Sequence, residues 1–317
     1  MSTAMTERPT EKKADPAKTT DRARGERRLG WMLAGPAFIV MLAVTLYPIL
    51  NAVWLSLFQY RLTDPDNRSF IWFKNYSVIL SDPLWWQVIW VTILITIITV
   101  VVELVIGFAL AMVMNKALKT LRPVLRTAIL IPYAIITVVS AFAWQFAFAL
   151  DTGFVNNWLG WLPGIDASTD WFGSFWPSIA IICLSEIWKT TPFISLLLLA
   201  GLAQVPEDMQ EAAKVDGATA WQRLYKVTLP NMKAAIMVAV LFRTLDAFRI
   251  FDNVFVMTGG ANETETVSFL AYRTTIERVE IGLGSAVSVL LFLCVVLIAA
   301  VAIKLFRVDL SQMRGDK

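Results

Sequence analysis

The 317-residue chain is 57% hydrophobic and only 17% charged, which excludes an ordinary soluble domain and indicates an integral membrane protein. It has no histidine, and its two cysteines, Cys183 and Cys294, each lie in an apolar run, so neither a disulfide framework nor a metal site is predicted. The net charge of +3 needs no nucleic-acid partner to explain it.

The chain begins with a polar segment. Residues 1–28 mix Lys and Arg with Asp and Glu, and they lack the apolar centre and cleavage site of a secretory signal. We predict a disordered cytoplasmic tail over 1–28, a transmembrane domain over 29–308 and a second cytoplasmic tail over 309–317.

Six apolar runs follow, each long enough to cross a hydrocarbon core of about 30 Å. They cover residues 33–58, 88–114, 125–148, 179–203, 234–257 and 283–306. Pro132 and Pro192 lie inside two of them, and spanning helices tolerate proline where neighbouring helices satisfy the freed backbone groups. The runs predict an all-α integral membrane protein with about six transmembrane helices, some of them kinked.

Lys and Arg gather in alternate loops. They are frequent in the N-terminal segment, after the second and fourth runs, and at the C-terminus, whereas residues 151–177 contain none. Because short cytoplasmic loops collect basic residues, we predict a multi-pass protein of the cell membrane with both termini in the cytoplasm.

The loop over 205–230 predicts a short helix-turn-helix on the cytoplasmic membrane surface. Pro206 suits a first helical turn, Glu207 and Asp208 suit the positive end of the helix dipole, and Gly217 suits a turn. A second amphipathic stretch follows over 219–227 and ends at Pro230. These residues fit an interfacial hairpin and a docking site equally well.

The residue spacing in this loop resembles the EAA loop of ABC importer permeases. Glu211, Ala212 and Ala213 are followed after three residues by Gly217, and after nine more by Val227–Pro230, with valine where isoleucine is usual. The resemblance implies that the loop docks into a nucleotide-binding subunit, with Glu211 paired to a basic residue there. The implied coupling residues are Glu211, Ala212, Ala213, Asp216 and Gly217.

No phosphate-binding glycine loop of the Walker type occurs in the chain. We therefore expect no enzyme activity and no cofactor on this chain, with ATP and Mg bound by a separate ATPase. The family resemblance implies a homologous second permease subunit, two copies of the ATPase and an extracytoplasmic sugar-binding lipoprotein as partners, in addition to the sugar and the lipid bilayer.

Further motifs resemble carbohydrate permeases of the maltose and glycerol-phosphate type. They are Glu26–Leu29, Tyr47–Pro48, Lys189–Phe193 and Thr258–Gly260. Two longer strings, Glu186–Phe193 and Phe242–Asn253, are similar to first permease subunits of mycobacterial trehalose importers. The resemblance implies an ATP-driven sugar importer with trehalose as its cargo.

Charged residues interrupt the apolar runs. Arg243, Asp246, Arg249 and Asp252 recur every three residues, and Glu186 with Lys189 forms a similar expected pair. A charge at the bilayer centre costs about 2.5 to 3.5 kcal/mol. A self-neutralising ladder between helices and a polar wall of a transport path both fit these charges. Glu103, alone in the second run, has no obvious partner, and we expect it to form a buried hydrogen bond.

The chain resembles the maltose importer in motifs of its fourth and fifth apolar runs. Aligning these motifs implies which residues contact the sugar. They are Glu186, Lys189, Thr190, Phe193, Arg243, Asp246 and Ala247. Arg249, Asp252 and Asn253 follow them in the chain and are predicted to form a gate or a support.

Two other functions are considered. The intramembrane charges also fit an ion-coupled secondary transporter of a polar solute, but the EAA-type loop argues against it. An intramembrane enzyme would need a nucleophile with a base or metal ligands; without histidine, and with both cysteines in apolar runs, only carboxylates remain for that role.

Overall fold

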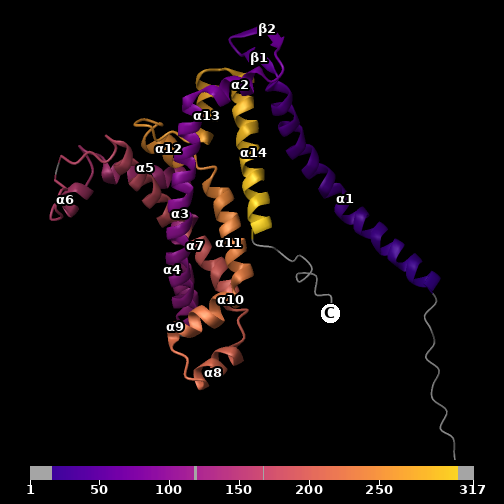
Figure 1. Ribbon diagram of the computed structural model, residues 1–317, viewed down its shortest axis with the longest axis vertical. Coiled ribbons are helices and arrows are strands. Elements are labelled where there is room, and N and C mark those ends of the chain that lie inside the picture. The colour runs from indigo at the N-terminus through magenta and orange to yellow at the C-terminus, as the bar shows by residue number, and fades with distance from the viewer. Residues whose placement is uncertain (1–15, 118–119, 167, 306–317) are drawn as a thin grey trace, which may run out of the picture. The chain divides into compact units, whose positions relative to one another are not determined.

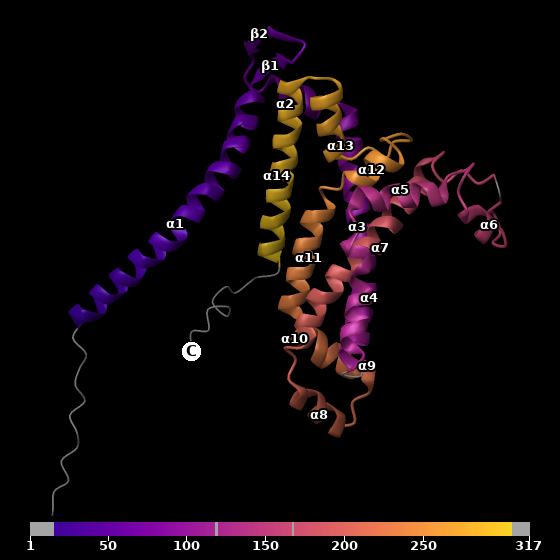
Figure 2. The same ribbon diagram turned by 180° about the vertical axis from the view of Figure 1, so that it is seen from behind.

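The computed structural model describes residues 16–117, 120–166 and 168–305, and it divides between Trp54 and Leu55 into two units (Figures 1 and 2). Helix α1 (Pro16–Leu55) makes up nearly all of the described part of the first unit. Its residues 28–55 are apolar and long enough to span a membrane.

The N-terminal helix begins earlier than the sequence predicts. Residues 16–28, expected to belong to a disordered tail, are helical in α1, because extending an existing helix adds a hydrogen bond per residue without a new nucleation cost. Residues 1–15 and the predicted C-terminal tail over 309–317 lie outside the described residues.

A small β-hairpin opens the second unit. Strands β1 (Phe58–Arg61) and β2 (Asp64–Phe70) pair antiparallel, and helix α2 (Lys74–Ser81) follows. Asn75 of α2 donates hydrogen bonds to the carbonyls of Ser56 (2.7 Å) and Phe58 (3.0 Å). The hairpin adds a small sheet to the helical architecture. The Asn75 side chain anchors α2 to the start of the hairpin.

The centre of the second unit is the long pair α3 (Pro83–Lys116) and α7 (Phe175–Leu202). A Cβ atom added at Gly107 of α3 would lie 2.9 Å from Cγ2 of Ile194 on α7, so glycine allows this close approach. Buried threonines on α3 donate to carbonyls of their own helix, for example Thr96 to Thr92 (2.7 Å).

The third apolar run is a broken element. Helices α4 (Arg122–Ala134) and α5 (Thr137–Phe148) meet at an angle of 83° just after Pro132. Pro132 lies inside the last turn of α4, where it removes one backbone donor and weakens the end of the helix, which stops at Ala134. In the described part of the chain, four helices are long and apolar enough to span a membrane, or five if this bent pair is one span.

The fifth apolar run does not form the single span that the sequence predicts. Helix α11 (Lys233–Ala247) ends early, and α12 (Asp252–Met257) begins after a short irregular turn. The carbonyl of Ile250, freed by this break, accepts a hydrogen bond from the Thr266 hydroxyl (3.1 Å). Irregular backbone at membrane depth is stable only where such partners or a polar cavity satisfy it, and this break meets both conditions.

The remaining elements of the second unit lie between and beyond the long helices. Helix α6 (Val155–Leu159) follows α5; α13 (Val267–Tyr272) and the π-helical turn Arg273–Glu277 lead into the last helix, α14 (Ile281–Leu305). Figures 1 and 2 place the hairpin and α2 at the opposite end of this unit from α8 (Glu207–Val215), α9 (Ala220–Arg223) and α10 (Leu229–Asn231).

Candidate functional site

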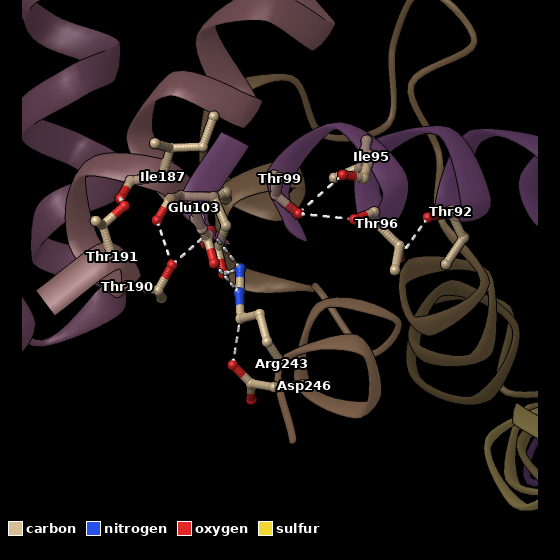
Figure 3. Close-up of polar contacts among 12 residues, drawn as sticks. Thr92, Ile95, Thr96, Thr99, Glu103, Ile187, Thr190, Thr191, Arg243 and Asp246 are labelled. Carbon is tan, nitrogen blue, oxygen red and sulfur yellow. Dashed lines mark hydrogen bonds and ion pairs between the residues drawn. The ribbon is translucent and has the colours of Figure 1, made fainter. Parts of the chain in front are cut away.

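Arg243 of α11 is the centre of a buried ionic cluster. Its side chain is 1% exposed, and its Nε and Nη2 donate to the two carboxylate oxygens of Glu103 on α3, with Nη2 to Oε1 at 3.0 Å. Nη2 also donates to Glu186 Oε1 on α7 (2.8 Å), and Nη1 to Asp246 Oδ2 (2.7 Å). Figure 3 shows the guanidinium lying between Glu103 and Asp246. One side chain thus ties together α3, α7 and α11.

Two further side chains hold the carboxylates in place. Asn253 at the start of α12 donates from Nδ2 to the second oxygen of Glu186 (2.6 Å). The Thr190 hydroxyl lies 2.7 Å from Glu103 Oε1 and 2.7 Å from the Glu186 carbonyl. Bidentate and charge-assisted bonds of this kind fix both distance and orientation. The carboxylates of Glu103 and Glu186 are therefore held rigidly.

The cluster contains more carboxylates than cationic side chains. Three carboxylates, those of Glu103, Glu186 and Asp246, face the single guanidinium of Arg243. The Asp246 side chain is 64% exposed, whereas Glu103 is fully buried. Because carboxylates only accept hydrogen bonds, the exposed side of the cluster suits a ligand that brings hydroxyl donors.

A polar cavity of about 400 Å³ opens beside the cluster. It lies between the α4–α5 break, α7 and the irregular turn after α11. Its lining includes Tyr133, Thr137, Glu186, Lys189, Thr190, Asp246, Arg249, Ile250, Phe251, Asp252 and Asn253. This volume lies within the usual range for small-molecule sites, and the lining combines charged groups with two aromatic rings.

One wall of the cavity contains stacked aromatic rings. The Tyr133 ring stacks on Phe193 with centroids 5.5 Å apart, and Lys189 Nζ lies 5.5 Å from the centroid of Tyr133. A cation held over an aromatic face is attracted by the ring quadrupole. The wall therefore offers an ammonium donor beside an apolar ring.

Most of the predicted site residues meet at this cavity. Those that line it are Glu186, Lys189, Thr190, Asp246, Arg249, Asp252 and Asn253. The other three do not line it: Arg243 lies behind Glu186 and Asp246, Phe193 supports Tyr133, and Ala247 is buried at 1% exposure.

The predicted charge pairs are only partly correct. Arg243 and Asp246 form the expected ion pair, but among the described residues Glu186 pairs with Arg243, not with Lys189. Lys189 extends toward Tyr133 instead. The regular row also ends at the α11 break, where Arg249 Nε donates to the Leu245 carbonyl (3.2 Å), because residues beyond the break no longer share a helix face.

The sequence missed the partner of Glu103 and the contribution of α4. The expected buried hydrogen bond of Glu103 exists, but it belongs to an ion pair with Arg243, a residue 140 positions away. Tyr133 and Thr137 enter the cavity at the α4–α5 break. A tyrosine directly after Pro132 within an apolar run was the available signal, because the break turns this segment toward the interior.

The helix-turn-helix at the other end of the unit has the predicted turn at Gly217, but its second helical stretch does not end at Pro230. It continues through α10 toward α11, because proline is tolerated in a first helical turn. Helix α8 ends before Gly217, whose φ of +76° places it in the left-handed region that favours glycine. The Ala218 amide donates back to the Ala213 carbonyl (2.9 Å). Thr219 and Gln222 form a capping box that starts α9, as sequence pairs of this type do.

The outer surface of this segment is exposed. Glu211, Ala212, Asp216 and Gly217 are exposed and Ala213 is half-buried, while Val215 is 87% exposed. Gln210 Nε2 donates to Thr228 Oγ1 (2.9 Å), which ties α8 to the π-helical turn Leu224–Thr228. The segment is thus internally ordered, yet its tip and most of the five predicted coupling residues are open to a partner.

Comparison with known proteins assigns a family. The family described as "Binding-protein-dependent transport system inner membrane component" matches residues 103–308. The trehalose transport system permease protein SugA of Mycobacterium tuberculosis is 51% identical over 287 residues, covering 90% of this chain and 91% of that protein. The trehalose/maltose transport system permease protein MalF of Thermococcus litoralis is 35% identical, covering 89% of this chain and 95% of that protein.

A solved structure shares the fold. A chain of a bacterial ABC transporter involved in the import of the acidic polysaccharide alginate aligns with a TM-score of 0.76 at 22% sequence identity. The alignment covers 90% of this chain and 98% of that one. The all-α permease architecture predicted from the sequence is therefore confirmed.

Proposed function

The chain belongs to the family of inner membrane components of binding-protein-dependent transport systems, and we propose that trehalose is the sugar it moves inward. It is a permease of an ABC importer, and its family excludes the alternative of an ion-coupled transporter. The 51% identity to a trehalose permease over 90% of the chain is the observation that carries the choice of sugar.

The cavity beside Arg243 supports a sugar in chemical terms. Asp246 and Glu186 accept hydrogen bonds from hydroxyls, Lys189 donates one, and the Tyr133 ring packs against an apolar sugar face. Thr190 lies between them on α7. Arg243 positions the carboxylates of Glu186 and Asp246, and Phe193 supports the Tyr133 ring. Ala247 is the small residue at the end of α11. Arg249, Asp252 and Asn253 serve as the gate or support on the other wall.

Uptake of labelled sugar tests this proposal directly. The permease is reconstituted in vesicles with its second permease, the ATPase and the sugar-binding lipoprotein, and labelled trehalose is supplied with and without ATP. We expect ATP-dependent trehalose accumulation that excess unlabelled trehalose suppresses. If the vesicles accumulated maltose but not trehalose, the choice of sugar would be wrong. If uptake continued without ATP hydrolysis, ATP would not be the source of energy for transport.

The segment Glu207–Pro230 is proposed as the contact with the ATPase. Its open tip, formed by the end of α8 and Gly217, suits insertion into a cleft, and Glu211 presents an exposed carboxylate to a basic partner residue. Ala212, Ala213 and Asp216 complete the docking surface. Closure of two ATP-bound ATPase subunits then moves α8, and the Gln210–Thr228 bond carries this motion toward α10 and α11.

We propose the following composition for the complete transporter. It contains this permease, a homologous second permease, two ATPase copies that bind ATP and Mg, and an extracytoplasmic sugar-binding lipoprotein. The permease itself has no enzymatic role. Both termini lie in the cytoplasm, because the coupling segment with Lys214, Arg223 and Lys226 must face the ATPase. Cysteine labelling of each terminus from outside intact cells tests the orientation.

A further inference from the structure

A cavity in two parts lies where α3 meets the coupling segment, away from the polar cavity at Arg243. The first part is a groove of about 450 Å³ whose lining residues are all apolar. Leu104, Phe108 and Met112 form one face of it along α3, and Trp221 and Leu224 form the opposite face. The groove therefore suits a hydrocarbon chain.

The second part is polar and adjoins the groove. Its volume is about 380 Å³, and it shares Met112 and Leu224 with the apolar part. Lys116 of α3 and Arg223 of α9 line it, and Glu207 belongs to the same lining. Two cations against one carboxylate leave it with a net positive charge.

The cations of the polar part have free hydrogen-bonding capacity. Nε of Arg223 is buried and has no hydrogen-bond partner in the structure. Within the described ranges, no ion pair involves Arg223 or Lys116. Arg122 brings a third cation nearby, since its Nη2 donates to the Asn115 carbonyl (2.9 Å). A buried Nε–H donor without a partner is costly even on a half-buried arginine, so an anion here would relieve it.

The order of the two parts along α3 matches an amphiphile. From Leu104 to Met112 the helix rises about 12 Å at 1.5 Å per residue, all of it beside the groove. The polar part begins at Met112 and continues to Lys116, the last residue of α3. Because α3 is a candidate membrane span, the tail would run along the hydrocarbon and the head would lie at the membrane surface.

We propose that this cavity binds one anionic phospholipid of the cytoplasmic leaflet. Arg223 and Lys116 hold its phosphate, and one acyl chain fills the groove between α3 and the segment Trp221–Leu229. The lipid braces the coupling segment against α3, so the membrane's anionic lipid content tunes how firmly that segment is held. A soluble phosphate would leave the apolar groove empty, which is why the membrane is the favoured source.

Lipid retention by the purified, assembled transporter tests the site. The complex is placed in phosphatidylcholine nanodiscs containing a small fraction of phosphatidylglycerol, and native mass spectrometry counts the phosphatidylglycerol retained. Near an anionic leaflet each cation contributes on the order of 1 kcal/mol, so the double variant Lys116→Ala/Arg223→Ala should retain it about 30-fold more weakly.

Two single variants separate the groove from the charges. Ala109→Phe fills the groove and leaves both cations intact, and we expect it to lose the same lipid. Ile106→Phe is the matched control, because Ile106 lies on the same helix, is 41% exposed and does not line the groove. It should retain phosphatidylglycerol as the parent does.

Three results would overturn the proposal. Unchanged retention in the double variant or in Ala109→Phe would show that the lipid binds elsewhere. If soluble glycerol phosphate displaced the lipid when present at a concentration similar to that of phosphatidylglycerol, the site would be one for a soluble phosphate. Absence of retained lipid in the parent complex would show that another subunit covers the groove. Retention is measured without sugar or ATP, so its outcome is independent of the choice of trehalose.

Discussion

The buried cluster at Arg243 and the exposed segment Glu207–Pro230 differ in where their polar groups find partners. In the cluster, four charged side chains from three helices bond to one another, and Arg243 is 1% exposed. In the segment, hydrogen bonds are local, such as Ala218 to Ala213, and Val215 at its tip is 87% exposed. The ion pairs of the cluster form within this chain, whereas the segment presents a surface that the described part of the chain leaves uncovered.

This difference predicts how each region responds to mutation. A change in the cluster leaves a buried charge without a partner, so it should cost folding stability together with transport. A change on the exposed face of the segment removes no internal contact, so it should affect transport alone. Four substitutions test this contrast, here in order of their expected effect on the free energy of unfolding.

Arg243→Ala should be the most destabilising. It leaves the carboxylates of Glu103 and Glu186 buried without their cation, and breaking a buried ion pair in this way costs about 3 to 5 kcal/mol. Thermal unfolding of the purified complex measures the loss. Arg249→Ala is the control, because Arg249 is exposed and, within the part of the chain that the structure describes, its one side-chain hydrogen bond goes to the Leu245 carbonyl. Equal stability of the two variants would contradict a structural role for the cluster.

Glu103→Gln should have the second largest effect. Glutamine keeps the shape but loses the charge, and its amide faces the Arg243 guanidinium, so a charge-assisted bond worth about 1.5 to 3 kcal/mol is lost. We also expect a higher KM for trehalose uptake, since Arg243 would lose the charged partner that orients it and would hold Glu186 and Asp246 less rigidly. Thr190→Val removes the contacts of the hydroxyl with Glu103 and with the Glu186 carbonyl but keeps every charge, so it serves as the milder comparison. An unchanged KM in Glu103→Gln would separate the cluster from sugar recognition.

Gly217→Ala should cost less. The residue has φ +76°, and an added Cβ meets no atom within 4 Å, so the cost is confined to the backbone, at roughly 1 to 2 kcal/mol. ATP-driven uptake and co-purification of the ATPase measure the effect on coupling. Gly217→Asn should recover part of both, because asparagine tolerates this conformation better than alanine does. If alanine and asparagine behaved alike, backbone conformation would not be the cause.

Glu211→Ala should leave the stability of the permease within about 0.5 kcal/mol, because exposed substitutions away from packed features rarely exceed this value. Uptake should nevertheless fall sharply, with less ATPase retained by the complex. Asp208→Ala, in the same helix and also exposed, is the matched control and should transport normally. Equal losses in both variants would indicate a general effect of negative charge on α8.

Sequence patterns predicted features that depend on neighbours along the chain. The apolar runs placed the core of α3, α7 and α14, and the spacing of Glu211 to Gly217 located the end of α8 and its turn. Helix ends, left-handed glycines and hydrophobic runs are local properties, since a few adjacent residues decide them. The family resemblance, together with the charges inside the apolar runs, pointed to most of the residues that line the polar cavity.

Only the tertiary structure decided which charges meet. Glu103 and Arg243 lie 140 residues apart, and Glu186 pairs with Arg243 although Lys189 is one turn away on its own helix. Apolar helices of similar composition can pack at many rotations, so sequence alone does not select the faces that touch. The end of α11 at Ala247 has the same origin. The Thr266 hydroxyl donates to the Ile250 carbonyl, and the polar cavity borders the turn, so the backbone freed by the break is satisfied by tertiary partners.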